Sequence, residues 1–431
     1  MRPFRKKDSC FVGILIFVLL CLRAAAGNTE PITSLSAIQT LHSFKKFYFI
    51  PNFKMGGNYN LGEEADYEWG GTGGVTLESL GVGPLRVAYI AVGNPIRDEK
   101  GKIINAVVIN SYIFGDSTNM YYFWHEGNEG TEFSMGAVVG PGGLIDTEKY
   151  YVVFVDGLGL WGASKPSDGL GMKFPNYSYY DIVQANYRLL KDELNVAKIK
   201  LASGVSMGGS LCYVWAILHP NFVEAIMPIG GNTSPDPVAR WIFRLMTAAI
   251  QSDPVWLETK GNYYHLPKER RKNKGIMFGW SILDLMAYDF KFRVTLPWED
   301  VKKGVFSWEP EGDEGEELKK RATDYDMNDL LYRNRTCDLY HIDGQLHRIK
   351  ANTLVIHMKN DQWLIYPAIE KSTRMIKGAK LIGFESPLAH YAVFRAPHMA
   401  KKEVLSFFKE IGMVPGSKES GTSKGKSLFE K

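Results

Sequence analysis

Cysteine is scarce in this chain, because only four cysteines occur among its 431 residues. Two of them, Cys10 and Cys21, lie in an N-terminal apolar stretch, which leaves Cys212 and Cys337 for the rest of the chain. So few cysteines exclude the disulfide frameworks of small secreted domains. Cys212 falls inside a predicted buried helix, where a free thiol packs as a small apolar side chain.

An excess of charge of one sign is also lacking, since 51 Lys and Arg residues face 47 Asp and Glu residues. The formal net charge of +4 comes from residues 1–26, which carry five basic side chains and one acidic side chain. Nucleic-acid binding needs a basic surface, so a nucleic-acid partner is not expected. The nine histidines are scattered, and Trp124-His125-Glu126 alone is not a metal site. Neither a metal nor a cofactor is expected.

Long hydrophobic runs are missing too, because no apolar stretch reaches the roughly 20 residues of a transmembrane helix. The apolar residues 10–22 follow a basic segment and precede Ala24-Ala25-Ala26. This order is typical of a cleavable signal peptide. We therefore expect residues 1–26 to be a signal peptide, and the mature protein to be secreted or periplasmic without a stable membrane anchor. Residues 27–74 are then an N-terminal segment before the core.

Short β-rich runs alternate with helical stretches from about residue 75 onward. Strands are predicted at residues 85–92, 106–112, 150–155, 199–204, 224–229, 352–358 and 380–384. From residue 106 these are mostly continuous apolar runs, as expected of strands buried on both faces. The strand–helix–strand order indicates an α/β fold with a mainly parallel central sheet flanked by helices.

One long interval, of about 120 residues, follows the predicted strand that ends near Gly230. This strand is the fifth of those listed above and is expected to be the sixth strand of the complete sheet. The interval is too long for a simple crossover. Its residues 238–250 have apolar side chains at helical spacing, and its acidic run 309–317 is typical of a solvated linker. We expect a large helical lid at residues 232–350 between two parts of the α/β core, residues 75–231 and 351–413. The tail, residues 414–431, is predicted to be disordered.

The pentapeptide Gly204-Val205-Ser206-Met207-Gly208 follows a predicted strand and precedes a predicted buried helix. A G-x-S-x-G sequence in this position is the pattern of a nucleophile elbow. Its glycines permit a sharp turn that lifts the serine Oγ clear of the backbone. We therefore predict Ser206 as a catalytic nucleophile rather than as part of a structural turn.

A nucleophilic serine needs a base, which in this fold class comes last in the chain order of serine, acid and histidine. His390 lies on a loop after the last predicted strand and is predicted to be this base. His398 is a reserve candidate, but it falls inside the predicted terminal helix. His357 falls inside the strand predicted at residues 352–358 and is more typical of a packing residue.

The acid that orients the base is predicted to be Asp361, which directly follows that strand. Asp338 and Asp343 precede the strand and are weaker candidates. The oxyanion hole needs two backbone N–H groups. One is expected from Met207, and the other from Ile113 or Tyr112 after the strand at residues 106–112.

A second glycine pattern, Gly157-Leu158-Gly159-Leu160-Trp161-Gly162, matches G-x-G-x-x-G after a strand. A dinucleotide site would require a helix to begin there. The residues that follow, 163–169, continue instead as a loop. A nucleotide site is therefore not expected.

With these residues placed, the chain resembles the homoserine O-acetyltransferase branch of the α/β-hydrolase superfamily, from about residue 75 to 413. The motifs that carry the resemblance are Val139-Gly140-Pro141-Gly142, Phe174-Pro175, Ser206-Met207-Gly208-Gly209, Ser252-Asp253-Pro254, Asp361, and His390 with Ala392 and Phe394. The resemblance implies the α/β-hydrolase fold and a triad of Ser206, Asp361 and His390.

The chain also departs from this family in its substrate contacts. The family's histidine is usually followed by an aspartate, whereas this chain has Tyr391, and the lid arginine of the acetyltransferases is replaced by Thr247. Tyr391 and Tyr112 are the substrate-binding candidates here. Loss of a paired acid and base should weaken the binding of an amino acid. An exported enzyme would also lack acetyl-CoA, a cytoplasmic donor.

These observations predict an exported serine hydrolase that cleaves an ester or related acyl bond through an acyl-enzyme on Ser206. The alternative is an O-acyltransferase related to homoserine O-acetyltransferase, and a third class is a non-catalytic binding protein of the same fold. The expected partners are a small ester or acyl substrate and a second copy of the chain, bound through the lid.

Overall fold

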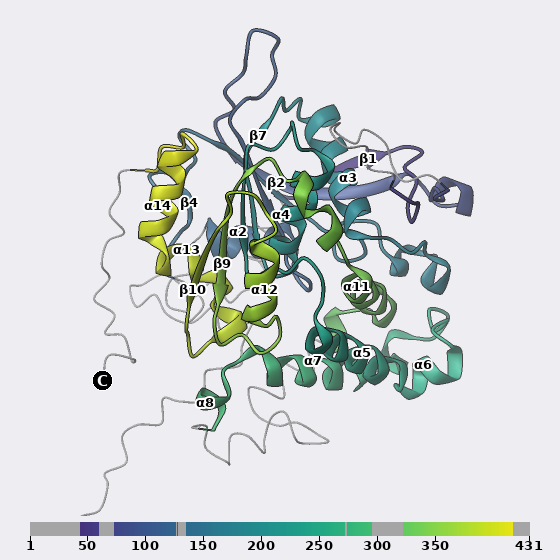
Figure 1. Cartoon of the computed structure of the whole chain (residues 1–431). Coiled ribbons are helices and arrows are strands. Elements are labelled where there is room, and N and C mark those ends of the chain that lie inside the picture. Colours follow the sequence, from purple (N-terminus) through teal and green to yellow (C-terminus); the bar gives the residue numbers. More distant parts are fainter. Residues whose placement is uncertain are drawn as a thin grey trace, which may run out of the picture.

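A computed structural model describes residues 44–59, 73–125, 127, 135–271, 274–294 and 322–416. Its centre is an eight-stranded sheet (Figure 1). In spatial order its strands are β1 (Lys46–Ile50), β2 (Leu85–Gly93), β6 (Tyr151–Val155), β3 (Ala106–Asn110), β7 (Ile199–Val205), β8 (Ala225–Ile229), β9 (Asn352–Met358) and β10 (Lys380–Phe384). β2 is antiparallel to β1 and β6, and the other neighbours are parallel. The mainly parallel sheet predicted from the sequence is confirmed.

Helices flank this sheet. The helices of the core are α2 (Ser117–Trp124), α3 (Tyr179–Arg188), α4 (Met207–Leu218), α12 (Tyr366–Thr373), α13 (Ala396–Met399) and α14 (Lys401–Glu410). In Figure 1, α3, α4 and α12 lie on one side of the sheet, and α13 and α14 lie on the other. Every residue of β3 and β8 is buried as a result. Burial on both faces is the physical reason why these strands are continuous apolar runs in the sequence.

The edge strand β1 was not predicted, although it lies within the segment 27–74. β1 pairs with β2 along its whole length, so this part of the N-terminal segment belongs to the core sheet. Two of its aromatic side chains, Phe47 and Phe49, are about half exposed, at 50% and 52%. A strand whose apolar residues face water has no continuous buried run, and the sequence signal for a core strand is therefore weak.

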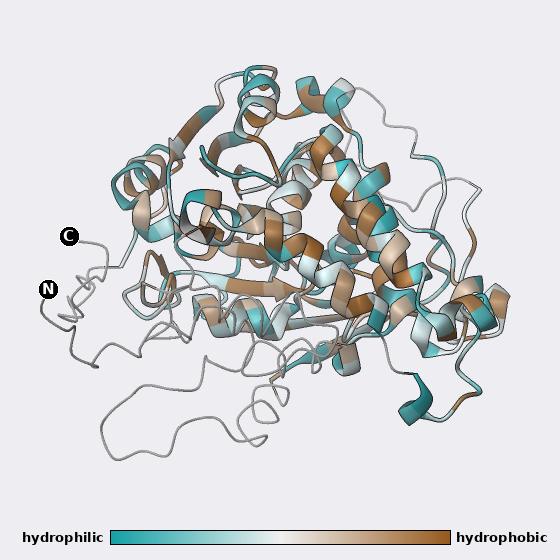
Figure 2. Cartoon of the chain, turned by 90° about the horizontal axis from the view of Figure 1, so that it is seen from below, coloured by the Kyte–Doolittle hydropathy of each residue, from teal (hydrophilic) through white to brown (hydrophobic). Residues whose placement is uncertain are grey.

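The long interval after β8 is an insertion of helices. Within the described residues it contains α5 (Pro237–Gln251), α6 (Pro254–Thr259), α7 (Lys274–Ala287), α8 (Phe290–Arg293) and α11 (Met327–Leu339). In Figure 1, α5, α6 and α7 lie together at the bottom, with α11 above them. Figure 2 looks from below and shows apolar residues along the helices that face the viewer. On α5, Trp241 and Leu245 are 69% and 54% exposed. That the insertion acts as a lid, or joins two copies, stays a prediction.

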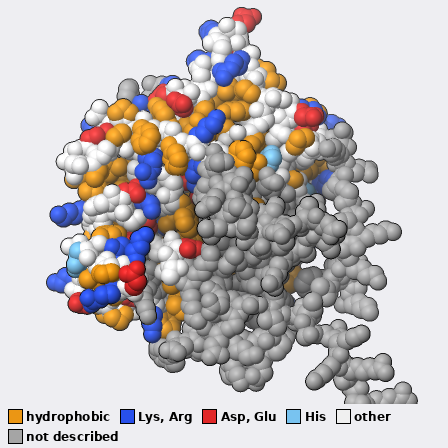
Figure 3. All heavy atoms as spheres, turned by 180° about the vertical axis from the view of Figure 1, so that it is seen from behind, with side chains coloured by type: hydrophobic (Ala, Val, Ile, Leu, Met, Phe, Trp, Pro, Cys, Tyr) orange, Lys and Arg blue, Asp and Glu red, His pale blue; other side chains and the backbone are white. Residues whose placement is uncertain are grey.

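Several predictions fall on parts of the chain outside the described residues: the signal peptide, the acidic run 309–317 and residues 417–431 of the tail. Where the structure describes helices, none combines the length and hydrophobicity that a bilayer crossing requires. On the described part of the face in Figure 3, acidic and basic side chains are interspersed.

His219 is a buried titratable group beside the helix that follows the nucleophile. All twelve residues of α4 are buried, and His219 caps its C-terminal end. The imidazole stacks on Tyr187 with 3.8 Å between ring centroids, and within the described residues neither ring nitrogen has a hydrogen-bond partner. Burial lowers the pKa of His219 to about 3.

This burial predicts a specific loss of stability in acid. In the unfolded chain the histidine binds a proton below about pH 6.5, whereas in the folded chain it stays neutral down to about pH 3. The stabilisation is therefore complete above pH 6.5 and is lost as the pH falls, at about 1.4 kcal/mol per pH unit for this group. We expect His219→Phe to flatten this part of the pH dependence, measured by urea unfolding between pH 7.5 and 5. The exposed control His265→Phe should keep the wild-type slope, and an equal slope in His219→Phe would contradict the assignment.

Candidate active site

Ser206 stands at the sharp turn between β7 and α4. Its backbone has φ 55° and ψ −122°, a conformation that is strained for a residue with a side chain. The flanking positions require glycine because the carbonyl oxygen of Asn110 lies close to both. A Cβ on Gly204 would lie 2.7 Å from this oxygen, and a Cβ on Gly208 would lie 2.5 Å from it. The neighbouring strand β3 thus presses against the turn. This geometry is that of a nucleophile elbow.

The structure brings the three predicted residues Ser206, His390 and Asp361 together. His390 Nε2 lies 2.9 Å from Ser206 Oγ, and His390 Nδ1 lies 2.6 Å from Asp361 Oδ2. The Nδ1–H donates to the carboxylate, so Nε2 is free to accept the serine hydroxyl proton. All three residues are buried. The arrangement can therefore activate the serine as a nucleophile.

Asp361 is held as a charged group although it is fully buried. Burial alone would raise the pKa of Asp361, but the charge and hydrogen bond of His390, a weaker contribution from His357 and the backbone N–H of Leu364 hold it below its ordinary value. Its Oδ1 accepts from the N–H groups of Trp363 and Leu364 at 2.9 and 3.0 Å. The carboxylate thus stays ionised and fixes the orientation of His390.

Of the other candidates from the sequence, His357 contacts the triad acid, and the rest bind other partners. His357 is in β9, where its Nε2 donates to the carbonyl of Leu364 at 2.7 Å and lies 3.5 Å from Asp361 Oδ2. Burial lowers the pKa of His357, which favours the neutral imidazole beside Asp361. His398 contacts the carbonyl of Gly136 at 3.0 Å. Two further carboxylates bind partners outside the triad: Asp338 pairs with Arg240 and Arg244, and Asp343 accepts from Thr233.

The two predicted oxyanion donors lie beside the nucleophile. Met207 is the first residue of α4, and Ile113 follows β3, and both line the same pocket as Ser206. Within the described residues, the N–H groups of Met207 and Ile113 have no hydrogen-bond partner. The N-terminus of α4 adds a partial positive charge at this point. The role of these N–H groups stays a prediction.

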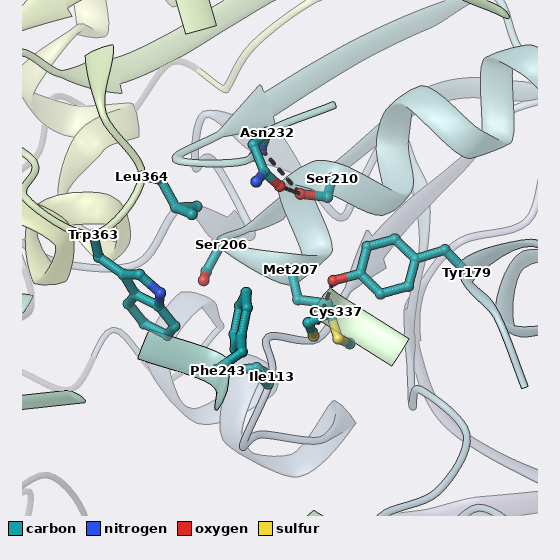
Figure 4. Close-up of a pocket in the computed structure, with 10 residues that line it drawn as sticks. All are labelled: Ile113, Tyr179, Ser206, Met207, Ser210, Asn232, Phe243, Cys337, Trp363 and Leu364. Carbon is teal, nitrogen blue, oxygen red and sulfur yellow. Dashed lines mark hydrogen bonds between the residues drawn. The ribbon is translucent and has the colours of Figure 1, made fainter. Parts of the chain in front are cut away.

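A narrow pocket opens around Ser206 (Figure 4). The space between its lining atoms is about 290 Å³, which includes the part that is open to solvent. The lining residues are Ile113, Tyr179, Ser206, Met207, Ser210, Asn232, Phe243, Cys337, Trp363 and Leu364. In Figure 4 the Ser206 hydroxyl points into the space between Trp363 and Phe243. The described residues that line the pocket include no charged side chain.

Two substrate-binding candidates from the sequence are absent from this described lining. Tyr112 packs edge-on against Phe394, with 5.2 Å between centroids. The hydroxyl of Tyr391 donates to Asp284, which is buried on α7. Phe243 and Trp363 line the pocket instead, and the sequence offered no signal for them, because apolar residues at helical spacing or in a loop are usually part of the core. The described residues include no group of three or more His, Cys, Asp or Glu side chains arranged to hold a metal ion.

Comparisons with known proteins identify similar sequences and structures. No protein-family model matches the chain. The chain is 27% identical over 377 residues to a homoserine O-acetyltransferase of Solidesulfovibrio magneticus, covering 80% of this chain and 91% of that protein. It is 24% identical over 310 residues to a protein of Methanothermobacter thermautotrophicus named a probable acyltransferase, covering 71% and 86%.

Solved structures show the same fold. An acetylester hydrolase from Corynebacterium glutamicum matches with a TM-score of 0.62 and 20% identity, over 76% of this chain and 91% of that chain. A homoserine O-acetyltransferase from Bacillus anthracis matches with a TM-score of 0.62 and 20% identity, over 84% and 96%. The α/β-hydrolase fold and the resemblance to the homoserine O-acetyltransferase branch are both confirmed.

Proposed function

We propose that this chain, an α/β-hydrolase-fold enzyme of the esterase and acyltransferase kind, transfers a short acyl group. In this proposal the acyl group is carried as an ester on Ser206. The acceptor that we propose is an uncharged alcohol. The serine hydrolase predicted first from the sequence becomes the second candidate, because the curated relatives carry acyltransferase names.

The triad supports the first half of the reaction. Ser206 Oγ attacks the acyl carbonyl while His390 Nε2 takes the hydroxyl proton. The negative oxygen of the tetrahedral intermediate would accept from the N–H groups of Met207 and Ile113. When the intermediate collapses, His390 returns the proton to the leaving group, and the acyl group remains on Ser206.

In the second half, His390 takes a proton from the acceptor hydroxyl, whose oxygen attacks the acyl carbonyl of the ester. The bond between the acyl carbon and Ser206 Oγ then breaks, and His390 returns the proton to Ser206 Oγ, which releases the new ester and regenerates the enzyme. The observation that carries transfer over hydrolysis is the apolar shielding of the nucleophile: Ser206 is 7% exposed, and Phe243, Trp363, Leu364 and Ile113 surround it. Such a lining disfavours water and favours an acceptor with an apolar body.

The same pocket argues against a zwitterionic acceptor such as homoserine. Its described lining contains no charged side chain, and a buried ammonium or carboxylate without a partner is costly. Thr247 is uncharged, and the hydroxyl of Tyr391 is bound to Asp284. If no alcohol acts as the acyl acceptor, water takes that role, and hydrolysis is therefore the second candidate function. Export and secretion remain part of the proposal, on the basis of residues 1–26.

Partition of the acyl group tests the proposal directly. With p-nitrophenyl acetate as donor and 1-butanol as acceptor, we expect butyl acetate to form and the release of p-nitrophenol to accelerate with butanol concentration. Homoserine at the same concentration should give less transfer than butanol. If acetate is the sole product whatever alcohol is added, the proposal of acyl transfer is wrong and hydrolysis replaces it.

A further inference from the structure

Arg333 is a buried cation beside the nucleophile that the triad chemistry does not use. It lies on α11, in the insertion, and its side chain is completely buried. Within the described residues it forms no ion pair with a carboxylate, and its Nε has no hydrogen-bond partner. A buried charge without a counter-ion is costly, so its surroundings must compensate for it.

Backbone carbonyls supply that compensation. Arg333 Nη2 donates to the carbonyls of Gly157 and Leu158 at 3.0 and 2.6 Å, and Nη1 donates to the carbonyl of Ile113 at 3.1 Å. Gly157 and Leu158 begin the glycine pattern that resembles a dinucleotide motif. A Cβ on Gly157 would lie 3.2 Å from Arg333 Nη1 and 3.2 Å from the Met207 Cε. The glycine at this position therefore leaves room for the guanidinium.

The guanidinium touches both residues whose N–H groups form the proposed oxyanion hole. Nη1 fixes Ile113 through its carbonyl, and it lies 3.6 Å from the sulfur of Met207. The carbonyl of the next residue, Phe114, accepts from the indole of Trp161 at 2.7 Å and from the hydroxyl of Tyr325 at 3.0 Å. The loop after β3 is thus fixed by hydrogen bonds from Trp161 of the glycine pattern and from Tyr325 and Arg333 of the insertion.

We propose that Arg333 is a positioning residue that fixes the Ile113 backbone as an oxyanion donor and packs on the Met207 side chain, and that its unpaired positive charge stabilises the negative oxygen formed during acyl transfer. The inference rests on the proposed acyl-enzyme chemistry. A preorganised positive charge in a water-excluded site acts where transition-state charge develops, and it does so without reorganisation. The predicted effect is therefore on kcat and acylation rather than on the affinity for the neutral substrate.

The test compares Arg333→Met and Arg333→Lys with the control Arg335→Met, an exposed arginine two residues further along the same helix. The acylation rate is measured from the burst of p-nitrophenol with p-nitrophenyl acetate, and thermal unfolding verifies the fold. We expect Arg333→Met to lower the acylation rate about 10- to 100-fold, less than the loss of a direct oxyanion donor, with KM changed by less than about threefold. Arg333→Lys should recover part of the rate because it keeps the charge, and Arg335→Met should match the wild type.

A second readout separates positioning from general support of the fold. A trifluoromethyl ketone forms a negatively charged tetrahedral adduct on the serine, and its affinity should fall in the same proportion as the acylation rate. A folded Arg333→Met enzyme that acylates within about threefold of the wild type, or that changes KM alone, overturns the inference. If Arg333→Met does not fold, Arg333→Lys and Gly157→Ala decide by the same criteria, since the added methyl group lies 3.2 Å from both Arg333 Nη1 and Met207 Cε and must shift one of them slightly. A wild-type enzyme that forms no acyl-enzyme rejects the proposed function and, with it, this inference.

Discussion

Ser206→Ala should lower kcat by about 10⁵-fold or more and leave the protein folded. The serine supplies the atom that becomes acylated, and an alanine has no group that His390 can deprotonate. The hydroxyl also contributes little to stability, because its described partner is His390 alone. Steady-state turnover of p-nitrophenyl acetate, with circular dichroism as a check of the fold, measures the effect.

Ser203→Ala is the matched control for this variant. Ser203 is buried in β7, three residues before the nucleophile, and its hydroxyl donates to the carbonyl of Met227 at 2.8 Å. Removing it should cost about 1 kcal/mol of stability and should change kcat by less than about threefold. Comparable losses of activity in the two variants would assign the effect to the fold of the elbow instead of the nucleophile.

Asp361→Asn should lower kcat by about 10⁴-fold, because the amide no longer fixes the histidine in the tautomer that accepts the serine proton. The carboxylate is fully buried, lies 2.6 Å from His390 Nδ1 and accepts two backbone N–H groups, so an amide nitrogen cannot replace it without losing an acceptor. KM should change little, since Asp361 is not among the residues that line the pocket.

Asp338→Asn and Asp343→Asn are controls for charge, because both carboxylates bind partners outside the triad. We expect both to retain wild-type kcat within about threefold. The double variant Ser206→Ala with Asp361→Asn should be no slower than Ser206→Ala alone, since residues that act as a unit are not additive. An additive loss, or a strong effect of Asp343→Asn, would contradict this assignment of the acid.

The sequence predicts the central sheet well, and it also identifies three residues that the structure brings together, because both depend on local patterns. Strands buried on both faces are continuous apolar runs, and the carboxyl ends of parallel strands place Ser206 and Asp361 at predictable points. His390 follows the last strand for the same reason. The edge strand β1 was missed because its aromatic residues are half exposed.

The substrate pocket was much harder to predict than the triad. Phe243 and Trp363 come from the insertion and from the loop after β9, and their positions depend on tertiary packing that no local pattern encodes. Arg333 lies among polar residues of α11, where an arginine on a helix is usually solvated, yet the structure buries it completely. The sequence has Tyr391 where the family usually has an aspartate, which suggests that a carboxylate is missing there. In the structure, however, the carboxylate of Asp284 accepts from the hydroxyl of Tyr391.

Labelling of the protein with a fluorophosphonate probe, followed by mass spectrometry of the modified peptide, tests the acyl-enzyme on Ser206 most directly. A serine activated by His390 at 2.9 Å should react with the probe, because the phosphonate reports the same nucleophilic attack as an ester. We predict a single adduct on Ser206 in the wild type and none in Ser206→Ala. An unlabelled wild type, an adduct on another residue, or equal labelling of both proteins would contradict the account.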